Sequence, residues 1–225
     1  MILHYRKPDD LPAEIPVFPL RGVILLPRST LPLNVFEPRY IALVNDALAG
    51  ARLVGIVQPD TGAGEEESPQ GSTVPLRKLG SVGRITAFQE TGDGRILITL
   101  TGVSRYRITG ERGTAAPYRV CQVDFSGFAQ DFEQGAGESA VNRKRLLKVL
   151  RSYLQAHDLS ADWESINRSS NELLVNTLSV ISPYGPEEKQ ALLEAPDLKA
   201  RAEVLIALAE MDLAARDDGA GGTVQ

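Results

Sequence analysis

The stretch at residues 79–108, LGSVGRITAFQETGDGRILITLTGVSRYRI, decides how the first half of this chain folds. Asp93-Gly94 stands between two runs of β-forming residues, and this dipeptide is a strong signal for a tight β-hairpin. After the turn, RILITL (95–100) alternates its apolar side chains between two faces, as a strand does. A further strand pattern follows in YRVCQVDF (118–125). The region therefore predicts an antiparallel meander.

The preceding segment, IPVFPLRGVILLPRSTLPLNVF (15–36), breaks short apolar pieces with prolines. A proline cannot donate to a β-ladder, so these pieces are predicted to be short or edge strands. The pattern then changes at LNVFEPRYIAL (33–43), where Pro38 suits the first turn of a helix and Gly50 suits its end. A strand at residues 52–58 is expected next.

Beyond a Gly- and Gln-containing boundary at residues 126–138, every periodic pattern is helical. The segment at 139–157 places leucines on one stripe, and Asp197 is expected to cap the last helix. Ser169-x-x-Glu172 matches a capping box for the helix that follows it. The predicted fold class is α+β, with an antiparallel β-barrel lobe carrying one or more short helices (13–126), a C-terminal α-helical lobe (138–214) and a disordered tail (215–225).

The composition and charge of the chain argue against nucleic acid and membranes as partners. The chain has 225 residues, with 24 Lys and Arg against 29 Asp and Glu, which gives a net charge of −5. Such a chain has no global positive field to attract nucleic acid. The single cysteine cannot form an intrachain disulfide, the N-terminus lacks the apolar core of a signal peptide, and no apolar run approaches the roughly 20 residues of a membrane span. We expect a cytoplasmic protein without a membrane partner.

The sequence carries no familiar catalytic or cofactor motif. The phosphate-binding patterns G-x-x-x-x-G-K-[ST] and G-x-G-x-x-G are missing, as is the nucleophile motif G-x-S-x-G. One cysteine and two histidines cannot supply a Cys/His zinc site. We therefore expect no catalytic residue, metal or cofactor, although a hydrolase with an unrecognised site remains an alternative.

Candidate binding residues gather at the change from strand to helix. Glu37 and Arg39 flank Pro38, and Phe36 and Tyr40 lie beside them. In one interpretation this charged corner is exposed for recognition of a partner's backbone or carboxylate. In the structural interpretation, Glu37 caps free N–H groups of the helix while Arg39 pairs with a nearby acid.

Two more candidates come from the expected sheet. Arg105-Tyr106-Arg107 places both arginines on one face of a strand, where a basic patch or an ordinary solvated face would result. Gln58, at the end of the strand at 52–58, completes the set of candidate contacts.

Several motifs together resemble those of one family. The opening PVFPLR (16–21), FEPRY (36–40), G-x-V-G-x-I (80–85), G-x-x-R-Y-R-I (102–108) and a helical EEKQALLE segment (187–194) are similar to the LON N-terminal, substrate-binding domain family over residues 13–213. The resemblance implies a PUA-like β-barrel packed against a helical lobe. It also implies a non-enzymatic role in binding polypeptides, as in stand-alone bacterial LON-domain proteins that lack the ATPase and protease modules.

The same resemblance defines the expected partners. These are unfolded or tagged polypeptides, or a protease or chaperone partner. Because PUA-like barrels in other families recognise RNA, an RNA- or nucleotide-binding role is the alternative, although the acidic charge makes nucleic acid an unfavoured partner.

Overall fold

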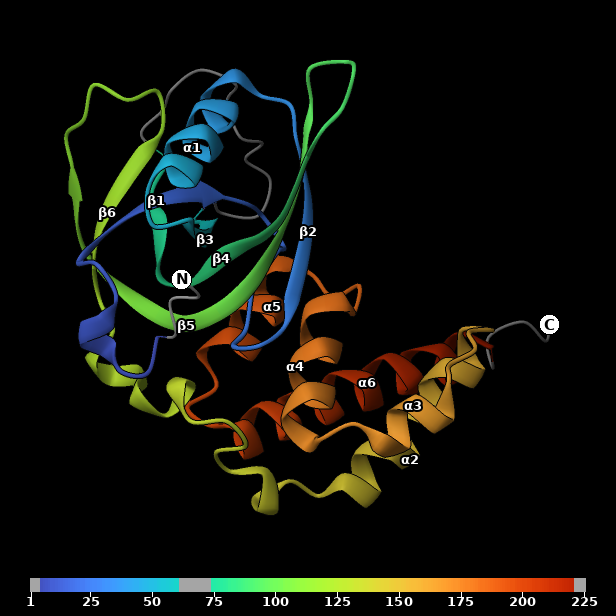
Figure 1. Cartoon of the computed structure of the whole chain (residues 1–225). Coiled ribbons are helices and arrows are strands. Elements are labelled where there is room, and N and C mark those ends of the chain that lie inside the picture. The colour runs from blue at the N-terminus through green and yellow to red at the C-terminus, as the bar shows by residue number, and fades with distance from the viewer. Residues whose placement is uncertain (1–4, 61–73, 221–225) are drawn as a thin grey trace.

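The computed structural model packs a β-barrel against a group of helices and describes residues 5–60 and 74–220 (Figure 1). The strands are β1 (Glu14–Pro19), β2 (Thr30–Val35), β3 (Leu53–Pro59), β4 (Leu76–Glu90), β5 (Ile96–Arg112) and β6 (Arg119–Asp124). The α-helices are α1 (Pro38–Ala49), α2 (Arg143–Ala156), α3 (Trp163–Arg168), α4 (Asn171–Ile181), α5 (Pro186–Glu194) and α6 (Leu198–Ala220). Short 3-10 helices are η1 (Pro8–Asp10), η2 (Ser126–Phe132) and η3 (Glu138–Ala140). The predicted α+β class is confirmed.

The strands form one mixed sheet in the order β2-β5-β4-β3-β1-β6, and an additional pairing of β5 with β6 closes it into a barrel. The long strand β5 makes this closure because it pairs with β2 over residues 96–101, with β4 over residues 96–107 and with β6 over residues 107–112. The expectation of a purely antiparallel barrel is wrong at one place, since β1 and β3 run parallel. They can do so because β2 and α1 lie between them in the chain and provide the long crossover that parallel strands need.

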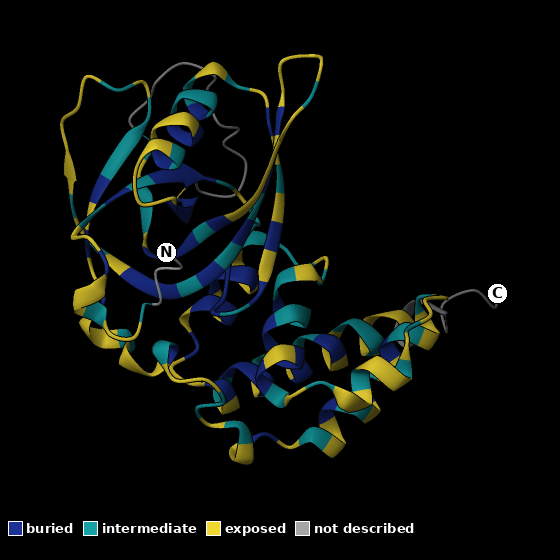
Figure 2. Ribbon diagram, viewed as in Figure 1, coloured by how far each residue is buried: buried dark blue, intermediate teal, exposed yellow. Residues whose placement is uncertain are grey.

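The predicted hairpin joins β4 to β5, whose ladder begins with Glu90 opposite Ile96. Gly94 adopts φ +82°, a left-handed conformation that glycine reaches without steric cost. Beyond the turn, Ile98 and Leu100 are buried whereas Leu97 is exposed, so the predicted alternation is confirmed. Figure 2 shows this hairpin projecting from the barrel with much of its surface exposed.

The prolines have different roles in β1 and β2. Among the strands that the structure describes, β2 pairs only with β5 and is an edge strand, where Pro32 is tolerated. Strand β1 is short, as predicted, but it lies between β3 and β6 rather than at an edge. It changes neighbours along its length: Glu14–Val17 pair with β6, and Val17–Pro19 pair with β3.

Helix α1 lies across the end of the barrel that is far from the other helices (Figure 1). Pro38 occupies its first turn and Gly50 its C-cap, as predicted. Its inward side chains, Tyr40, Leu43 and Val44, are buried against the barrel core. The helix therefore acts as a lid of packed apolar side chains over this end of the barrel.

Two expectations for the helical half need correction. The N-cap of α4 is Ser170, whose side chain accepts a hydrogen bond from the Leu173 N–H, so the predicted cap at Ser169 is one residue early. Helix α6 continues to Ala220, so the chain is helical at 215–220, where a disordered tail was expected. Residues 221–225 lie outside the described part. The predicted cap at Asp197 is confirmed, because its carboxylate accepts the Ala200 N–H at 2.8 Å.

The barrel and the helices share a hydrophobic core. Ile24 and Leu26, from the connection between β1 and β2, and Leu79 of β4 belong to the barrel half of the chain. They pack in one cluster with buried residues of α2, α4, α5 and α6. Two other clusters fill the barrel itself. The exact limits of the two lobes, 126 and 138, remain a prediction of the sequence.

Candidate functional site

Arg105, an expected surface contact, is instead a buried link between the lobes. Its side chain is 4% exposed and forms a two-pronged ion pair with Asp131, with nitrogen–oxygen distances of 3.0 and 2.9 Å. The same guanidinium donates to the main-chain carbonyls of Ala195 at 2.6 Å and Leu193 at 3.2 Å. Neither of the two expected outcomes, a basic patch or a solvated face, therefore holds at Arg105, because η2 and the loop after α5 cover it.

Gln58 is also a link between the lobes rather than an exposed contact. Its side-chain amide donates to the Pro186 carbonyl at 2.9 Å and to the Gln190 side chain at 3.0 Å. Its oxygen accepts the Gly22 N–H at 2.7 Å. All three bonds are within the protein, and the side chain is buried, so we correct its expected role from contact to positioning.

Further polar residues join the two sides of this interface, and apart from Glu172, which the sequence places in a capping box, they had no distinctive sequence signal. Arg28 pairs with Glu172 and donates to the Asp131 carbonyl at 2.8 Å, which ties the loop before β2 to α4 and η2. Asn176 donates to the Pro27 carbonyl at 3.1 Å and accepts from Arg201. Arg28 and Glu172 are separated by 144 positions, and from the sequence each is expected to be a solvated charge. Only the fold shows that the two side chains pair.

The charged corner at the start of α1 is formed by residues that contact one another. Arg39 donates to the Glu37 carboxylate at 2.9 Å and lies over the Tyr40 ring, 4.5 Å from its centroid. Glu37 is the N-cap residue, but its side chain makes this ion pair instead of the expected cap. Tyr40 is 4% exposed and stacks on Phe18 at 3.9 Å, whereas Phe36 is 64% exposed.

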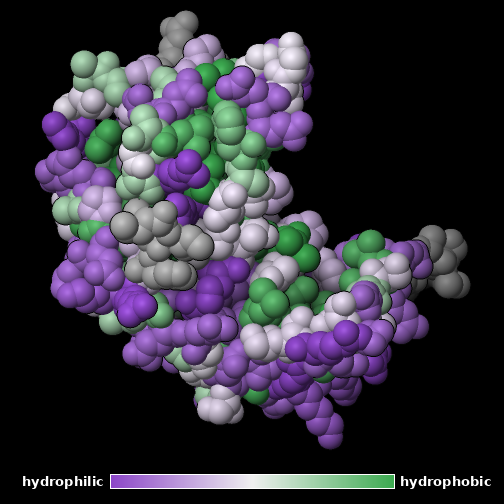
Figure 3. Space-filling model, viewed as in Figure 1, coloured by the Kyte–Doolittle hydropathy of each residue, from purple (hydrophilic) through white to green (hydrophobic). Residues whose placement is uncertain are grey.

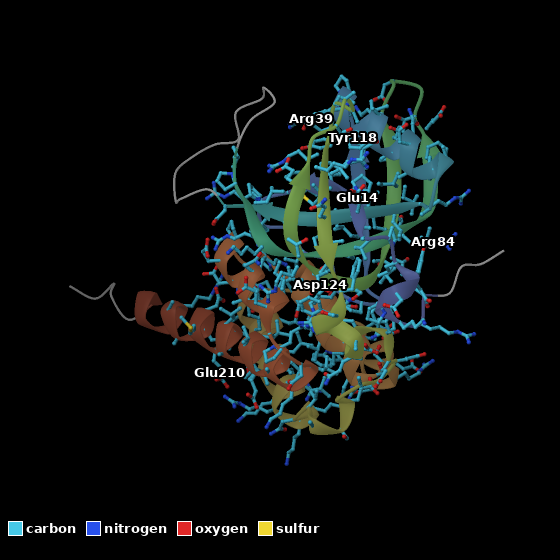
Figure 4. The ribbon with its side chains drawn as sticks, turned by 90° about the vertical axis from the view of Figure 1, so that its left-hand side faces the viewer. Glu14, Arg39, Arg84, Tyr118, Asp124 and Glu210 are labelled. Atoms are coloured by element: carbon cyan, nitrogen blue, oxygen red, sulfur yellow. The ribbon has the colours of Figure 1, made fainter. Side chains whose placement is uncertain are left out.

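Arg39 and Tyr40 contribute to a larger feature, which we call the barrel-mouth groove. It is an open hollow of about 790 Å³ between the start of α1, the start of β4, the end of β5 and the β5–β6 connection. Figure 4 shows Arg39 and Tyr118 at this end of the barrel, and Asp124 at the opposite end beside the helices. The residues that line the barrel-mouth groove are Pro19, Arg39, Tyr40, Pro59, Val74, Pro75, Leu76, Lys78, Ile108, Thr109, Gly110, Glu111, Arg112, Gly113, Thr114, Ala116, Pro117, Tyr118, Arg119 and Cys121.

The groove has a charged rim over an apolar floor. Arg119 pairs with Glu111, and its hydrogen bonds hold the pKa of that carboxyl below its usual value. Lys78 is an exposed cation of the rim. At the floor, burial raises the pKa of the Cys121 thiol to about 11, so the thiol is protonated near neutral pH and is a poor nucleophile. Such a surface can bind and orient a chain.

A second, smaller hollow lies among the helices. It measures about 160 Å³ and is lined mostly by apolar side chains of α2, α4 and α6, including Leu154, Leu178 and Leu205. Ile181, at its edge, is 66% exposed. Figure 3 shows apolar surface over α4 and beside the far part of α6. Helical periodicity alone could not separate these exposed apolar residues from core residues.

Neither a cluster of metal ligands nor a membrane-spanning helix is found among the described residues. His157 is paired with Asp212 at 2.6 Å and with Arg216 at 2.9 Å, and no cluster of three or more potential ligands occurs in residues 5–60 and 74–216. Within the part of the chain that the structure describes, each helix is too short or too polar to cross a bilayer.

Comparison with known proteins assigns this chain to a family. The sequence model for the ATP-dependent protease La (LON) substrate-binding domain matches residues 14–210. The chain therefore belongs to the LON substrate-binding domain family, a family of Lon-like polypeptide-recognition modules.

Relatives agree with this assignment. Over 203 residues the chain is 30% identical to Lon protease 2 of Myxococcus xanthus, covering 89% of this chain and 24% of that protein. It is 29% identical to the Lon protease of Anaeromyxobacter dehalogenans, covering 89% of this chain and 23% of that protein. The chain thus spans about a quarter of the length of these relatives.

Solved structures share the fold. The N-terminal domain of a Mycobacterium avium complex Lon protease aligns with a TM-score of 0.63 at 19% identity, covering 88% of this chain and 98% of that one. A Lon N-terminal domain protein from Xanthomonas campestris aligns with a TM-score of 0.59 at 22% identity, covering 86% and 97%.

Proposed function

We propose that this chain is a non-enzymatic module that binds an extended segment of an unfolded or tagged polypeptide in the barrel-mouth groove, without nucleotide. The observation that carries the proposal is the groove itself, which combines main chain, apolar floor and charged rim at an accessible end of the barrel. Peptide-recognition sites commonly combine these features, because main-chain contacts give affinity and pockets for side chains give selectivity.

The predicted site residues divide into two roles under this proposal. Arg39 and Tyr40 line the groove, and exposed Phe36 lies next to them in the chain, so these residues would contact the ligand. Gln58 and Arg105 hold the two lobes together and would keep the barrel in place without touching the ligand. We further propose that the protein works in the cytoplasm beside a protease or chaperone that receives the bound polypeptide.

A pair of neighbouring variants tests the groove directly. Ala116 lines it, whereas the exposed neighbour Ala115 does not. Ala116→Trp should fill the hollow and weaken binding of a fluorescein-labelled, reduced and carboxymethylated polypeptide by about tenfold or more, a loss of about 1.4 kcal/mol. Ala115→Trp should leave the affinity unchanged. Fluorescence anisotropy without nucleotide measures both.

The opposite outcomes are equally clear. Equal affinity for the two tryptophan variants would place binding outside the groove. No anisotropy change with any unfolded polypeptide would remove the proposed function, and a salt-sensitive shift with structured RNA would favour the nucleic-acid alternative.

A further inference from the structure

A small polar cavity lies where the barrel meets the helices, and we call it the interlobe cavity. It has a volume of about 20 Å³, which exceeds the roughly 10–15 Å³ that one water-sized ligand needs. Its lining comes mainly from the loop before β2, from β5 and η2, and from the helices α4 and α6. The cavity therefore has room for one small ligand held between the two lobes.

Three arginines line the interlobe cavity, and two of them have a carboxylate partner. Arg105 pairs with Asp131, and Arg28 pairs with Glu172. Arg201 is 3% exposed, and among the residues that the structure describes no carboxylate lies within ion-pair distance of it. Within the described part of the chain, one buried guanidinium of this cluster therefore lacks a countercharge in direct contact.

The guanidinium of Arg201 has one nitrogen that the protein leaves unbonded. Its Nε donates to the Leu192 carbonyl and its Nη1 donates to the Asn176 side-chain oxygen, both at 3.0 Å. Its Nη2 is buried and has no hydrogen-bond partner among the described residues. Because Asn176 also lines the interlobe cavity, the adjacent Nη2 is placed to donate into it. A buried polar group without a protein partner commonly marks a bound water or ion.

The charge around the interlobe cavity favours an anion over a water molecule. A water could satisfy Nη2 but would leave the buried charge of Arg201 uncompensated, which is costly. Asp197, the third acid of the lining, is exposed and caps α6, so solvent screens its charge. The positive end of the α6 dipole lies at the same place. Burial, together with the charge of Arg105, lowers the pKa of Arg201 to about 10, which leaves it protonated at neutral pH.

We propose that the interlobe cavity binds one small monovalent anion of the size of chloride, which accepts a hydrogen bond from Nη2 of Arg201. The anion would neutralise the third guanidinium and lie between residues of both lobes, so it would strengthen their contact. Tetrahedral oxyanions such as sulfate are too bulky for a cavity of about 20 Å³. Among the described residues, the interlobe cavity and the barrel-mouth groove share no lining residue, so this proposal does not depend on polypeptide binding.

Bromide tests the site directly, because it replaces chloride and its anomalous scattering locates it in a crystal. Crystals of the full chain soaked in sodium bromide should show an anomalous peak inside the interlobe cavity, in contact with Nη2 of Arg201. Bromide peaks on the protein surface alone, with only a water molecule in the cavity, would overturn the proposal.

Urea unfolding in sodium chloride and in sodium gluconate, at equal ionic strength, tests the same site in solution. An anion that binds only the folded chain lowers the unfolding constant, by about tenfold when its concentration is about ten times its dissociation constant. Arg201→Gln should lose this difference between the two salts. Arg145→Gln is the matched control and should keep the difference, because Arg145 is an exposed arginine that pairs with Glu210.

The wild-type measurements decide the matter even if Arg201→Gln does not fold, since the bromide map and the chloride dependence need no variant. Equal stability of the wild type in the two salts would overturn the proposal. A chloride effect that Arg201→Gln retains in full would also overturn it, because the anion would then bind elsewhere.

Discussion

Asp131 is the acid on which the contact between barrel and helices depends most. It accepts three hydrogen bonds from Arg105, including one from the main-chain N–H at 2.9 Å. Removing one member of a buried ion pair leaves the other charge uncompensated, at a cost of about 3–5 kcal/mol. We expect Asp131→Ala to lower the free energy of unfolding in urea by about this amount.

The matched control is the exposed pair of Arg145 and Glu210, which joins α2 to α6 (Figure 4 labels Glu210). Glu210→Ala should cost less than about 1 kcal/mol, because solvent screens exposed pairs. If Asp131→Ala were as mild as this control, the buried pair would not hold the lobes together.

Lys189 should make stability depend on pH. Its ammonium is buried and donates to the carbonyls of Ser179 at 2.8 Å and Val180 at 2.6 Å. Burial lowers its pKa from 10.5 to about 8. Between these values the unfolded state binds the proton and the folded state releases it, so the free energy of unfolding rises with pH.

The measurement is a urea series at several pH values for the wild type and for Lys189→Met. The wild type should gain up to about 3 kcal/mol relative to the variant between pH 8 and pH 10.5. Lys144→Met, at an exposed position of α2, is the control and should follow the wild type. A difference between the wild type and Lys189→Met that stays constant with pH would contradict the burial of a charged Lys189.

At the scale of elements, the bend of β5 at Gly102 joins the barrel to the loop before β2. The Gly102 N–H donates to the Ser29 carbonyl, and its own carbonyl accepts the Arg28 N–H, both at 2.9 Å. A Cβ at Gly102 would overlap the main-chain carbonyl of Leu26, which cannot move aside as a side-chain tip can.

Gly102→Ala should therefore destabilise the fold by about 3 kcal/mol or more, as expected for overpacking against main chain. Gly92→Ala, in the hairpin turn with nothing within 4 Å of the added Cβ, should be nearly neutral. Thermal unfolding followed by circular dichroism compares the two. Similar melting temperatures would show that the loop does not pack as closely as described.

Local patterns predict elements well where one face is exposed. The alternation around Leu97 and the Asp93-Gly94 turn were sufficient to predict the hairpin. The expected alternation of buried and exposed side chains fails at Ser104, Arg105 and Tyr106, which are all buried. The reason is that η2 and the helical lobe cover the face of β5 that would otherwise be exposed. No local pattern reports such long-range covering.

The candidate site was predicted only in part for the same reason. The corner at Arg39 and Tyr40 is contiguous in sequence, so its residues could be named from a local change of pattern. The rest of the groove is lined by the start of β4, the end of β5 and the β5–β6 connection, which only strand register and barrel closure bring together.

At the scale of the whole molecule, the shared core predicts cooperative unfolding. Leu79 of β4 packs into the cluster formed mainly by the helices, and Trp163, the single tryptophan, lies in α3. Leu79→Ala should cost about 2–5 kcal/mol and shift the urea midpoint seen by Trp163 fluorescence as far as the midpoint seen by circular dichroism.

The exposed Leu97 of the same sheet provides the control, since Leu97→Ala should shift both midpoints only slightly. Two separate transitions, with the Trp163 signal unaffected by Leu79→Ala, would mean that the lobes unfold independently.

The most direct test of polypeptide binding uses the purified chain, a labelled carboxymethylated polypeptide and no nucleotide. After prolonged incubation, the mixture is separated by size-exclusion chromatography and the polypeptide is weighed by intact-mass spectrometry. We predict that the polypeptide co-elutes with the protein, at its original mass, and that Ala116→Trp abolishes the co-elution. Separate elution, or fragments that a protein of demonstrated purity releases, would contradict a module that holds polypeptides without cutting them.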